Sequence, residues 1–319
     1  ERIHLVDLAV DYDRARSYFS GGNLRNAVKH FRRQKRLFRD LSPDLIISPN
    51  FNFDHYWLPF MKGRAKLVKE RHSSRFREEE QRNVASAAGR IRYLLSDWID
   101  SRYDHIVVLN ADEEKYVRSG NAVVIPNPVT IQSITAELTN KKVIAAGRIS
   151  PVKNFGDLIR AWYIVHRTCP DWQLDIFGED YLDTKKELEH LVTSLKLEQS
   201  VFFSGTVGRM TEKMSEYSIY AMTSETECFP MVLLEALSVG VPVVSYDCPN
   251  GPRNIVTHGD DGLISVHHDV EMLAGNLLYL MRDGERRQSM GRAAKENVLR
   301  FGTSKVMQKW QKLLNLPDV

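Results

Sequence analysis

Short apolar runs rich in β-branched residues alternate with segments whose apolar positions recur at helical spacing. The runs that predict strands lie at 44–48, 65–70, 105–109, 122–126, 142–147, 172–178, 200–205, 218–224 and 241–247. Between them, segments such as 154–169 carry one apolar stripe and stop before Pro170, as an amphipathic helix does. This alternation predicts parallel sheets with right-handed crossovers, and therefore an α/β protein with two Rossmann-like domains.

A turn and a polar stretch at 128–140 separate the pattern into two halves. We expect one domain over 1–135, a second over 136–303, and a last helix at about 304–319 that packs back on the first domain. Residues 1–8, "ERIHLVDL", look like a late strand of the first domain, and no other strand precedes 44–48. We therefore expect an N-terminal domain that lacks its beginning, and the absence of a starting methionine leaves an earlier targeting segment open.

Composition adds limits on the class of protein. The chain has 319 residues, 43% hydrophobic and 27% charged, which is enough for about two domains with their own cores. Cys169, Cys228 and Cys248 form no CxxC pair, so we expect free thiols in a reducing compartment and no cysteine metal site. No apolar run approaches the roughly 18 residues that a membrane span needs. The sequence thus predicts a cytoplasmic protein.

Positive charge is concentrated in the first half of the chain. Residues 1–140 contain 23 Lys and Arg against 18 Asp and Glu, and the remainder contains 21 against 23. The excess lies mainly on one helix-like segment, with Arg25, Lys29, Arg32, Arg33, Lys35, Arg36 and Arg39. This face is either a solvated surface or a docking face for an anionic membrane or a pyrophosphate, which would place the protein on the inner face of the plasma membrane. No nucleic-acid-reading motif accompanies it, so we expect no nucleic-acid partner.

Ligands of open α/β sheets bind at the carboxyl ends of the strands, and two loops of the second half have suitable residues there. Arg148 and Lys153 follow the run at 142–147 and precede a helix, so two cations are available for a diphosphate. Gly205 and Gly208 follow the run at 200–205 and would let the backbone approach a flat base closely. Both loops are therefore candidates for nucleotide binding.

A third loop contains an unusual acid. Glu235 is the only charged residue between Cys228 and Tyr246, and an isolated carboxylate in apolar surroundings is costly unless it has a partner. Glu227 precedes a helix expected to start near Pro230. Free N–H groups at the start of that helix, near 231–233, would face an anion.

These motifs together resemble a known family. "GRISPVKNF", "FSG", an E-x7-E pair in "ECFPMVLLEAL" and "GVPVV" follow one another as in the donor-binding half of retaining glycosyltransferases with the GT-B fold, over residues 141 to about 298. "SYDCPNGPRNI" is similar to bacterial members that build capsule, exopolysaccharide or lipid-linked oligosaccharide from UDP-sugars. The resemblance implies two Rossmann-like domains with the donor site in the cleft between them.

The resemblance also implies roles for particular residues. Glu235 would bind the ribose hydroxyls, so that its partners arrive with the nucleotide, and Glu227 would contact the transferred sugar. Arg148 and Lys153 would stabilise the departing pyrophosphate, where charge develops, and so make a metal dispensable. No cofactor is implied beyond the nucleotide-sugar donor. The donor-binding set would be Glu235, Gly147, Gly205, Thr206, Cys228, Phe229, Pro230, Met231, Val232 and Leu233, and the catalytic set Glu227, Arg148, Lys153 and His72.

The sequence departs from the family pattern where Cys228 replaces the usual glycine after the first acid. We interpret Cys228 as a small residue tolerated in the loop, with a reactive thiol as the alternative. The dipeptide His267–His268 is expected to lie in an exposed loop. Asp11 and Asp13 imitate the metal-binding tripeptide of the other glycosyltransferase fold, which we attribute to chance.

On the acceptor side several residues remain alternatives. Either Arg71 or His72, which follow the run at 65–70, would lie near the anomeric carbon, unless both belong to a surface turn. Asn50, Asn52 and His55 occupy another strand-end loop and could meet the acceptor.

Three functions are compatible with these features. The first is a retaining, metal-independent transferase that moves a hexose or N-acetylhexosamine from a nucleotide-sugar, such as a UDP-sugar, to a glycan or a polyprenyl-pyrophosphate-linked acceptor. The second is a nucleotide-sugar-binding module without turnover. The third, a dinucleotide oxidoreductase, lacks a G-x-G-x-x-G after a strand.

Overall fold

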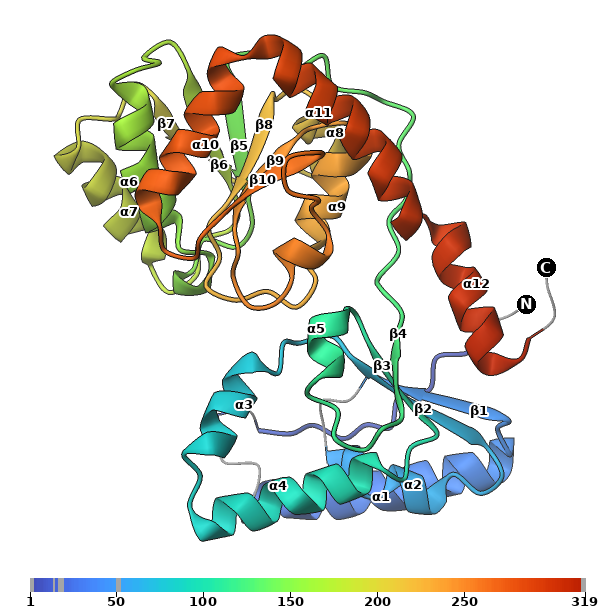
Figure 1. The fold of residues 1–319 in the computed structure, drawn as a ribbon. Coiled ribbons are helices and arrows are strands. Elements are labelled where there is room, and N and C mark those ends of the chain that lie inside the picture. Colours follow the sequence, from blue (N-terminus) through green and yellow to red (C-terminus); the bar gives the residue numbers. More distant parts are fainter. Residues whose placement is uncertain (1–2, 14, 17–19, 50–52, 317–319) are drawn as a thin grey trace. The chain divides into compact units, whose positions relative to one another are not determined.

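The computed structural model describes residues 3–13, 15–16, 20–49 and 53–316 (Figure 1). The chain divides into two compact units. The first unit comprises Glu1–Val108 and Glu114–Val124, and the second comprises Leu109–Glu113 and Ile125–Val319. Each unit has its own parallel sheet, which confirms the predicted fold class of α/β with two Rossmann-like domains.

The sheet of the first unit has four parallel strands in the order β1-β2-β3-β4. They are β1 (Leu45–Ser48), β2 (Lys66–Arg71), β3 (His105–Val108) and β4 (Ala122–Val124). The helices of this part of the chain are α1 (Gly21–Leu41), η1 (Phe53–Tyr56), α2 (Leu58–Met61), α3 (Phe76–Asn83), α4 (Ala87–Asp100) and α5 (Ala111–Glu114). The predicted strands at 44–48, 65–70, 105–109 and 122–126 are thus confirmed.

The predicted strand at residues 1–8 is wrong. Within the described residues 3–13 there is neither helix nor strand. The side chains of Ile3 and Leu5 are 91% and 95% exposed, so this segment has no buried face to pack against a sheet. The backbone of this segment contacts helix α1 instead, because Arg33 of α1 donates a hydrogen bond to the carbonyl oxygen of Ala9 at 2.8 Å.

The sheet of the second unit has six parallel strands in the order β10-β9-β8-β5-β6-β7. They are β5 (Lys142–Ala146), β6 (Gln173–Phe177), β7 (Val201–Phe203), β8 (Ile219–Met222), β9 (Val243–Tyr246) and β10 (Gly262–Ser265). The sequence analysis missed β10. Its run is short and begins with Gly262, which the hydrophobic pattern alone assigns to a loop.

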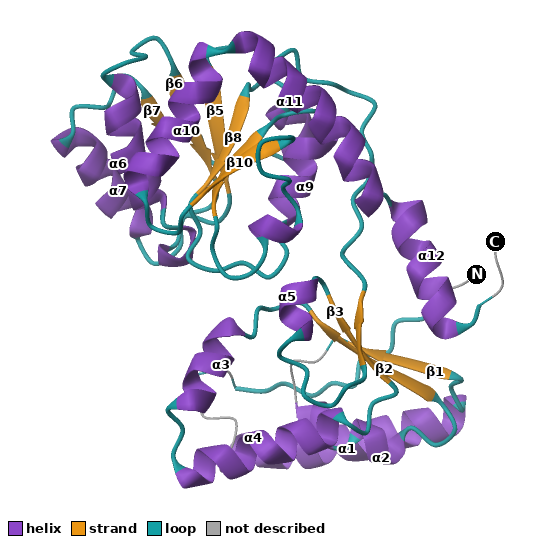
Figure 2. Cartoon of the chain, in the orientation of Figure 1, coloured by secondary structure: helices purple, strands orange, loops and turns teal. Residues whose placement is uncertain are grey.

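Helices cover both faces of this second sheet (Figure 2). The helical segments of this part of the chain are η2 (Pro151–Lys153), α6 (Phe155–His166), α7 (Thr184–Ser194), α8 (Met210–Met214), α9 (Met231–Ser238), η3 (Pro252–Asn254), α10 (Val270–Arg282), α11 (Gly284–Asn297), η4 (Val298–Phe301) and α12 (Thr303–Leu314). One core cluster joins α6, α7 and α10 to one face, and a second joins α8, α9 and α11 to the other. The last helix is confirmed as an element; its packing on the first unit stays a prediction.

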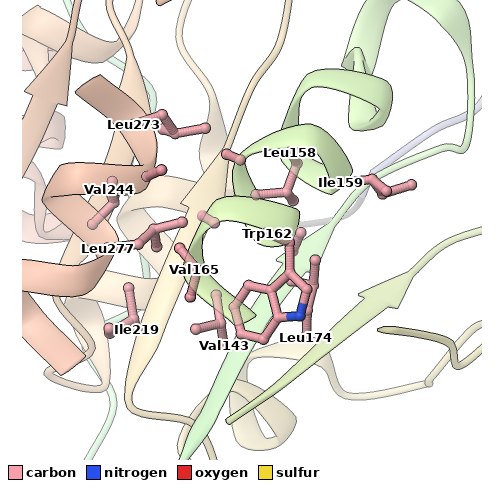
Figure 3. Packing of buried hydrophobic residues seen from close by; sticks show 14 of the residues in the cluster. Val143, Leu158, Ile159, Trp162, Val165, Leu174, Ile219, Val244, Leu273 and Leu277 are labelled. Atoms are coloured by element: carbon pink, nitrogen blue, oxygen red, sulfur yellow. The ribbon is translucent and has the colours of Figure 1, made fainter. Parts of the chain in front are cut away.

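Trp162 of α6 is a fully buried tryptophan in the first of these clusters. It is fully buried with Val143 and Leu174 of the sheet (Figure 3), and its indole Nε1–H donates to Ser200 Oγ at 3.2 Å. A buried indole needs such a partner for its one polar atom. The contact fixes α6 on the sheet, and with it the loop before α6 that contains Lys153.

Three glycines bring the carboxyl ends of β5, β6 and β7 together. Gly147 donates its N–H to Phe177 at 2.9 Å, and Gly178 donates to Gly205 at 2.7 Å. A Cβ on Gly178 would lie 1.9 Å from the carbonyl oxygen of Gly147, which no real side chain permits. The strand-end loops of the second unit can therefore approach one another only because residue 178 has no side chain.

We expect Gly178→Ala to destabilise the second unit by about 1–3 kcal/mol, the usual cost of forcing an added methyl into a packed site. The measurement is the midpoint of urea unfolding compared with wild type. Gly208→Ala is the matched control, because a Cβ there meets no atom within 4 Å. Equal midpoints for the two variants would contradict this account of the strand ends.

Candidate active site

The loop after β5 positions the two predicted cations. Arg148 follows Gly147, and Lys153 closes η2 directly before α6. The aliphatic part of the Lys153 side chain packs over Gly147, so closely that a Cβ on that glycine would lie 3.0 Å from Lys153 Cε. The guanidinium of Arg148 lies over the ring of Tyr181, with Cζ 4.9 Å from the ring centroid. Both cations are therefore held at the carboxyl end of the sheet, where such folds bind ligands.

Lys153 contacts one of the two predicted acids. Its Nζ lies 2.6 Å from Glu227 Oε1, and Ser224 donates its hydroxyl to the same oxygen at 2.8 Å. The side chains of Lys153 and Glu227 are 23% and 16% exposed. The sequence placed both residues in one site, but it gave no sign that they form an ion pair across 74 positions of chain.

A second loop fixes the backbone of Glu227. Its N–H donates to Pro249 at 2.8 Å, and Asn250 donates back to its carbonyl oxygen at 2.7 Å. Gly251 allows this contact, because a Cβ there would lie 2.5 Å from Pro230 Cδ. Sequence reasoning used "SYDCPNGPRNI" only as a sign of kinship, and it missed that the segment supports the Glu227 loop. The Gly251–Pro252 pair was the available signal.

Glu235 lies on α9 with its carboxylate unpaired. The structure shows no hydrogen bond or ion pair of this carboxylate with any residue that it describes. Burial alone raises the pKa of Glu235 above the ordinary value for a glutamate. A partly buried acid without a partner is the arrangement that the sequence predicted for Glu235.

The start of α9 offers fewer donors than predicted. Pro230 is the N-cap, and the N–H of Leu233 donates to the carbonyl oxygen of Pro230 at 3.1 Å. The expectation of free N–H groups at 231–233 is therefore wrong for Leu233. Met231 and Val232, the first two residues of the helix, retain N–H groups without an intrahelical acceptor.

The remaining donor-loop residues have distinct environments. Cys228 is buried, which favours its interpretation as a small packed residue. Phe229 is buried against Phe301, with ring centroids 5.5 Å apart. Gly205 and Thr206 are exposed, and Gly205 has φ +68°, a conformation that favours glycine.

In the first unit, the two alternatives after β2 differ in environment. Arg71 is buried and forms an ion pair with Asp100. Lys69 Nζ also contacts Asp100, at 2.5 Å. His72 is exposed, and its Nε2 lies 3.1 Å from Glu70 Oε2. Only His72 of the two therefore has a side chain available at the surface of its unit.

The other acceptor candidates are buried or lie outside the described residues. His55 is buried beside Lys69, and burial with the nearby cations lowers the pKa of His55 to about 3. Asn50 and Asn52 fall outside the residues that the structure describes. Asp13 pairs with Arg16 at 3.1 Å.

The expectation that His267 and His268 are exposed loop residues is confirmed for His268 and wrong for His267. His267 is half-buried, and His268, although exposed, lies 3.3 Å from Glu225. The cause is the missed strand β10, which brings this dipeptide to the same edge of the sheet as the loop after β8.

Comparison with known families identifies this arrangement of strand ends and acids. The model of the family "Glycosyl transferases group 1" matches residues 128–297, more than half of the chain. The chain belongs to this family. The match covers the strand-end loops that contain Lys153 and Glu227 and the helix α9 that contains Glu235, and the predicted resemblance is confirmed.

Several curated proteins are similar to part of this chain. An exopolysaccharide phosphotransferase of Streptomyces coelicolor is 33% identical over 66% of this chain and 23% of its own length. The amylovoran biosynthesis glycosyltransferase AmsD of Erwinia amylovora is 32% identical over 54% of this chain and 48% of its own. The chain thus spans less than half the length of these two curated relatives.

Two solved structures have the same fold as this chain. Anabaena HepE in complex with UDP matches with a TM-score of 0.78 at 21% identity, over 89% of this chain and 81% of HepE. The lipopolysaccharide outer core galactosyltransferase WaaB matches with a TM-score of 0.73 at 20% identity, over 92% and 81%. At this identity the likeness shows the GT-B fold.

The raised pKa of Glu235 predicts a pH-dependent cost of keeping this acid in the folded chain. Because the folded state holds the proton more tightly than the unfolded state, wild-type stability falls as pH rises from the ordinary glutamate pKa through the raised one. Glu235→Gln removes this titration. We expect the unfolding temperature of the variant, relative to wild type, to rise across that window. Thermal unfolding at a series of pH values measures this, and parallel curves for the two proteins would contradict it.

Proposed function

We propose that the chain is a retaining glycosyltransferase that moves a hexose or N-acetylhexosamine from a UDP-sugar to a glycan or lipid-linked acceptor in bacterial surface polysaccharide synthesis. The observation that carries the proposal is the ion pair of Lys153 and Glu227 at the carboxyl end of one parallel sheet, followed on α9 by Glu235, whose carboxylate has no partner among the described residues. The names of the relatives support the class of product, since they include amylovoran and lipopolysaccharide enzymes. HepE, whose structure contains UDP, supports the choice of nucleotide.

In this proposal the cations act on the leaving group. When the bond between the anomeric carbon and the UDP oxygen breaks, negative charge develops on the diphosphate. Lys153, Arg148 and the N–H groups of Met231 and Val232 would face that charge, and fixed donors of this kind need no reorganisation during the reaction. The ammonium group of Lys153 contacts Glu227 in the structure. Donor binding would therefore either move this group to the diphosphate or let it contact the carboxylate and the diphosphate together.

The two acids have different tasks. Glu235 would accept hydrogen bonds from the ribose hydroxyls, which supplies the partner that the chain does not. Glu227 would hold a hydroxyl of the transferred sugar, and its backbone contacts with Pro249 and Asn250 fix it for that purpose. On the acceptor side we propose His72 rather than Arg71 near the reacting carbon, because the side chain of Arg71 is engaged by Asp100.

We expect Glu235→Ala to lower the affinity for UDP about ten- to a hundredfold, because charged hydrogen bonds of this kind contribute roughly 1.5–3 kcal/mol. Glu227→Gln should bind UDP almost as wild type does and transfer sugar much more slowly, since its contact is with the sugar. Isothermal titration with UDP and a turnover assay on both variants measure the two effects.

The outcomes separate the alternatives. Loss of UDP binding in Glu227→Gln with normal binding in Glu235→Ala would reverse the two roles. Normal binding and turnover in both variants would place the donor site elsewhere. UDP-sugar binding by the wild type without turnover on any acceptor or water would favour the nucleotide-sugar-binding module.

The surface of the first unit supports contact with an anionic membrane. Basic side chains surround a hollow of about 740 Å³ at the end of α1, namely Arg32, Lys35, Arg36, Arg39, Lys62 and Arg64. A neighbouring apolar hollow is lined by α1 and α4 together. On α4, Ile91, Leu94 and Trp98 are 67%, 67% and 46% exposed at helical spacing. Exposed apolar residues beside a basic face are typical of peripheral membrane proteins.

We expect the chain to sediment with vesicles that contain anionic lipid, less so as salt rises, because charges are screened over about 10 Å at 0.1 M. Reversing Arg32, Lys35 and Arg36 to Glu should weaken binding at least about a hundredfold, at about 1 kcal/mol per basic residue. Arg33 is left intact, because it holds the carbonyl group of Ala9.

The matched control reverses Arg167, Lys186 and Lys196 of the second unit, which are also exposed. It changes the net charge by the same amount and should keep vesicle binding much closer to wild type. Equal binding by the two triple variants would show that the basic face is only solvated.

A further inference from the structure

Three side chains with metal-binding atoms lie together in the second unit. Glu225, His267 and His268 each present one ligand atom, and these atoms are all within 4.8 Å of one another. In the described part of the chain this is the one group of three or more His, Cys, Asp or Glu residues placed closely enough to share an ion. The dipeptide lies outside the sequence motifs on which the family resemblance rests, and the proposed transfer reaction does not use it.

The fold holds these residues on two strand-end loops. Glu225 follows β8, and its N–H donates to the carbonyl oxygen of Val152 at 2.8 Å. His267 and His268 follow β10 and precede α10. Because all strands of this sheet are parallel, both loops emerge at the same edge.

His268 has the hydrogen-bond environment of a metal ligand. Its Nε2 lies 3.3 Å from Glu225 Oε2, and its Nδ1 lies 3.5 Å from Asp157 Oδ2. A histidine that binds a metal through one ring nitrogen usually donates its other N–H to a carboxylate, which fixes the tautomer and the ring. Asp157 is itself held by Asn154, whose amide donates to Oδ2 at 2.9 Å.

The two ring nitrogens of His267 also differ in their surroundings: one has a hydrogen-bond partner in the protein, and the other is available for a ligand. Its ring stacks on that of His268 with centroids 3.9 Å apart, and it forms a hydrogen bond with the backbone of Ser224. The Nε2 atom is buried and has no hydrogen-bond partner among the described residues. The bond to Ser224 therefore uses Nδ1, and Nε2 is left for another ligand.

We propose that Glu225, His267 and His268 bind one divalent transition-metal ion, such as Zn²⁺ or Co²⁺, with Asp157 orienting His268. Imidazole and carboxylate together suit these ions. The 3.3 Å between His268 Nε2 and Glu225 Oε2 is close to the ligand separation of about 3.4 Å in a tetrahedral zinc site with bonds of about 2.1 Å. Water would complete the coordination. The ion takes no part in sugar transfer, and its effect is to join the loops after β8 and β10.

The test uses the tag-free chain, treated with a chelator and then titrated with CoCl₂ or ZnCl₂ in a calorimeter. We expect one equivalent to bind, visible d–d absorption of the bound Co²⁺, and a higher unfolding temperature with metal, since an ion that binds only the folded state stabilises it. His268→Ala and Glu225→Gln should each lower the affinity at least about tenfold and abolish the metal-dependent rise.

His190→Ala is the matched control, because His190 is an exposed histidine on α7 in the same unit. It should bind metal as wild type does. Unfolding temperatures without metal check that every variant folds. Wild type without saturable binding, or His268→Ala with wild-type affinity, would overturn the proposal and leave a hydrogen-bonded cluster. Neither donor nor acceptor is needed, so such a failure leaves the transferase proposal untouched.

Discussion

The arrangement of the strand-end loops in the second unit depends on the ion pair between Lys153 and Glu227. Its two side chains come from the loops after β5 and β8, which are adjacent strands of one parallel sheet. Each partner is fixed by its own support: Lys153 by its passage over Gly147 and by α6, and Glu227 by its backbone pairing with the loop at 249–250. If either side chain of this ion pair moved away, the other would remain as a partly buried charge without a partner, which would cost stability. The loops that contain the two residues are therefore held in one geometry.

Glu235 differs from Glu227 in having no such partner among the described residues. The fold leaves this acid partly buried and without a partner in the part of the chain that the structure describes, and burial raises its pKa. Polar groups that cost stability in the free chain and gain partners with a ligand are typical of binding sites. Lys153 and Glu227 form an ion pair, whereas Glu235 has no partner among the described residues. Two carboxylates only eight residues apart in the sequence therefore have opposite environments.

Much of this could be predicted from the sequence, because strands buried on both faces give continuous apolar runs and because one lone acid in such a run is conspicuous. The failures have a common physical origin. Residues 3–8 have an apolar pattern but pair with no strand in the described part of the chain, and a local pattern does not show whether a pairing partner exists. The short strand β10 begins with a glycine and was missed, and with it the approach of His267 and His268 to Glu225. The support of Glu227 by the loop at 249–251 depends on a contact between backbones, which side-chain patterns do not record.

The residues proposed for donor binding all belong to one contact unit with its own sheet and core, and the family model matches that same part of the chain. A half that folds around its own core can be inherited as a module. Packing within that core then constrains the strand-end loops of the second unit, whereas the sequence of the first unit can change without disturbing them. The second unit is accordingly the part that the family model matches, and the first unit, with its basic and apolar surfaces, lies almost wholly outside that match.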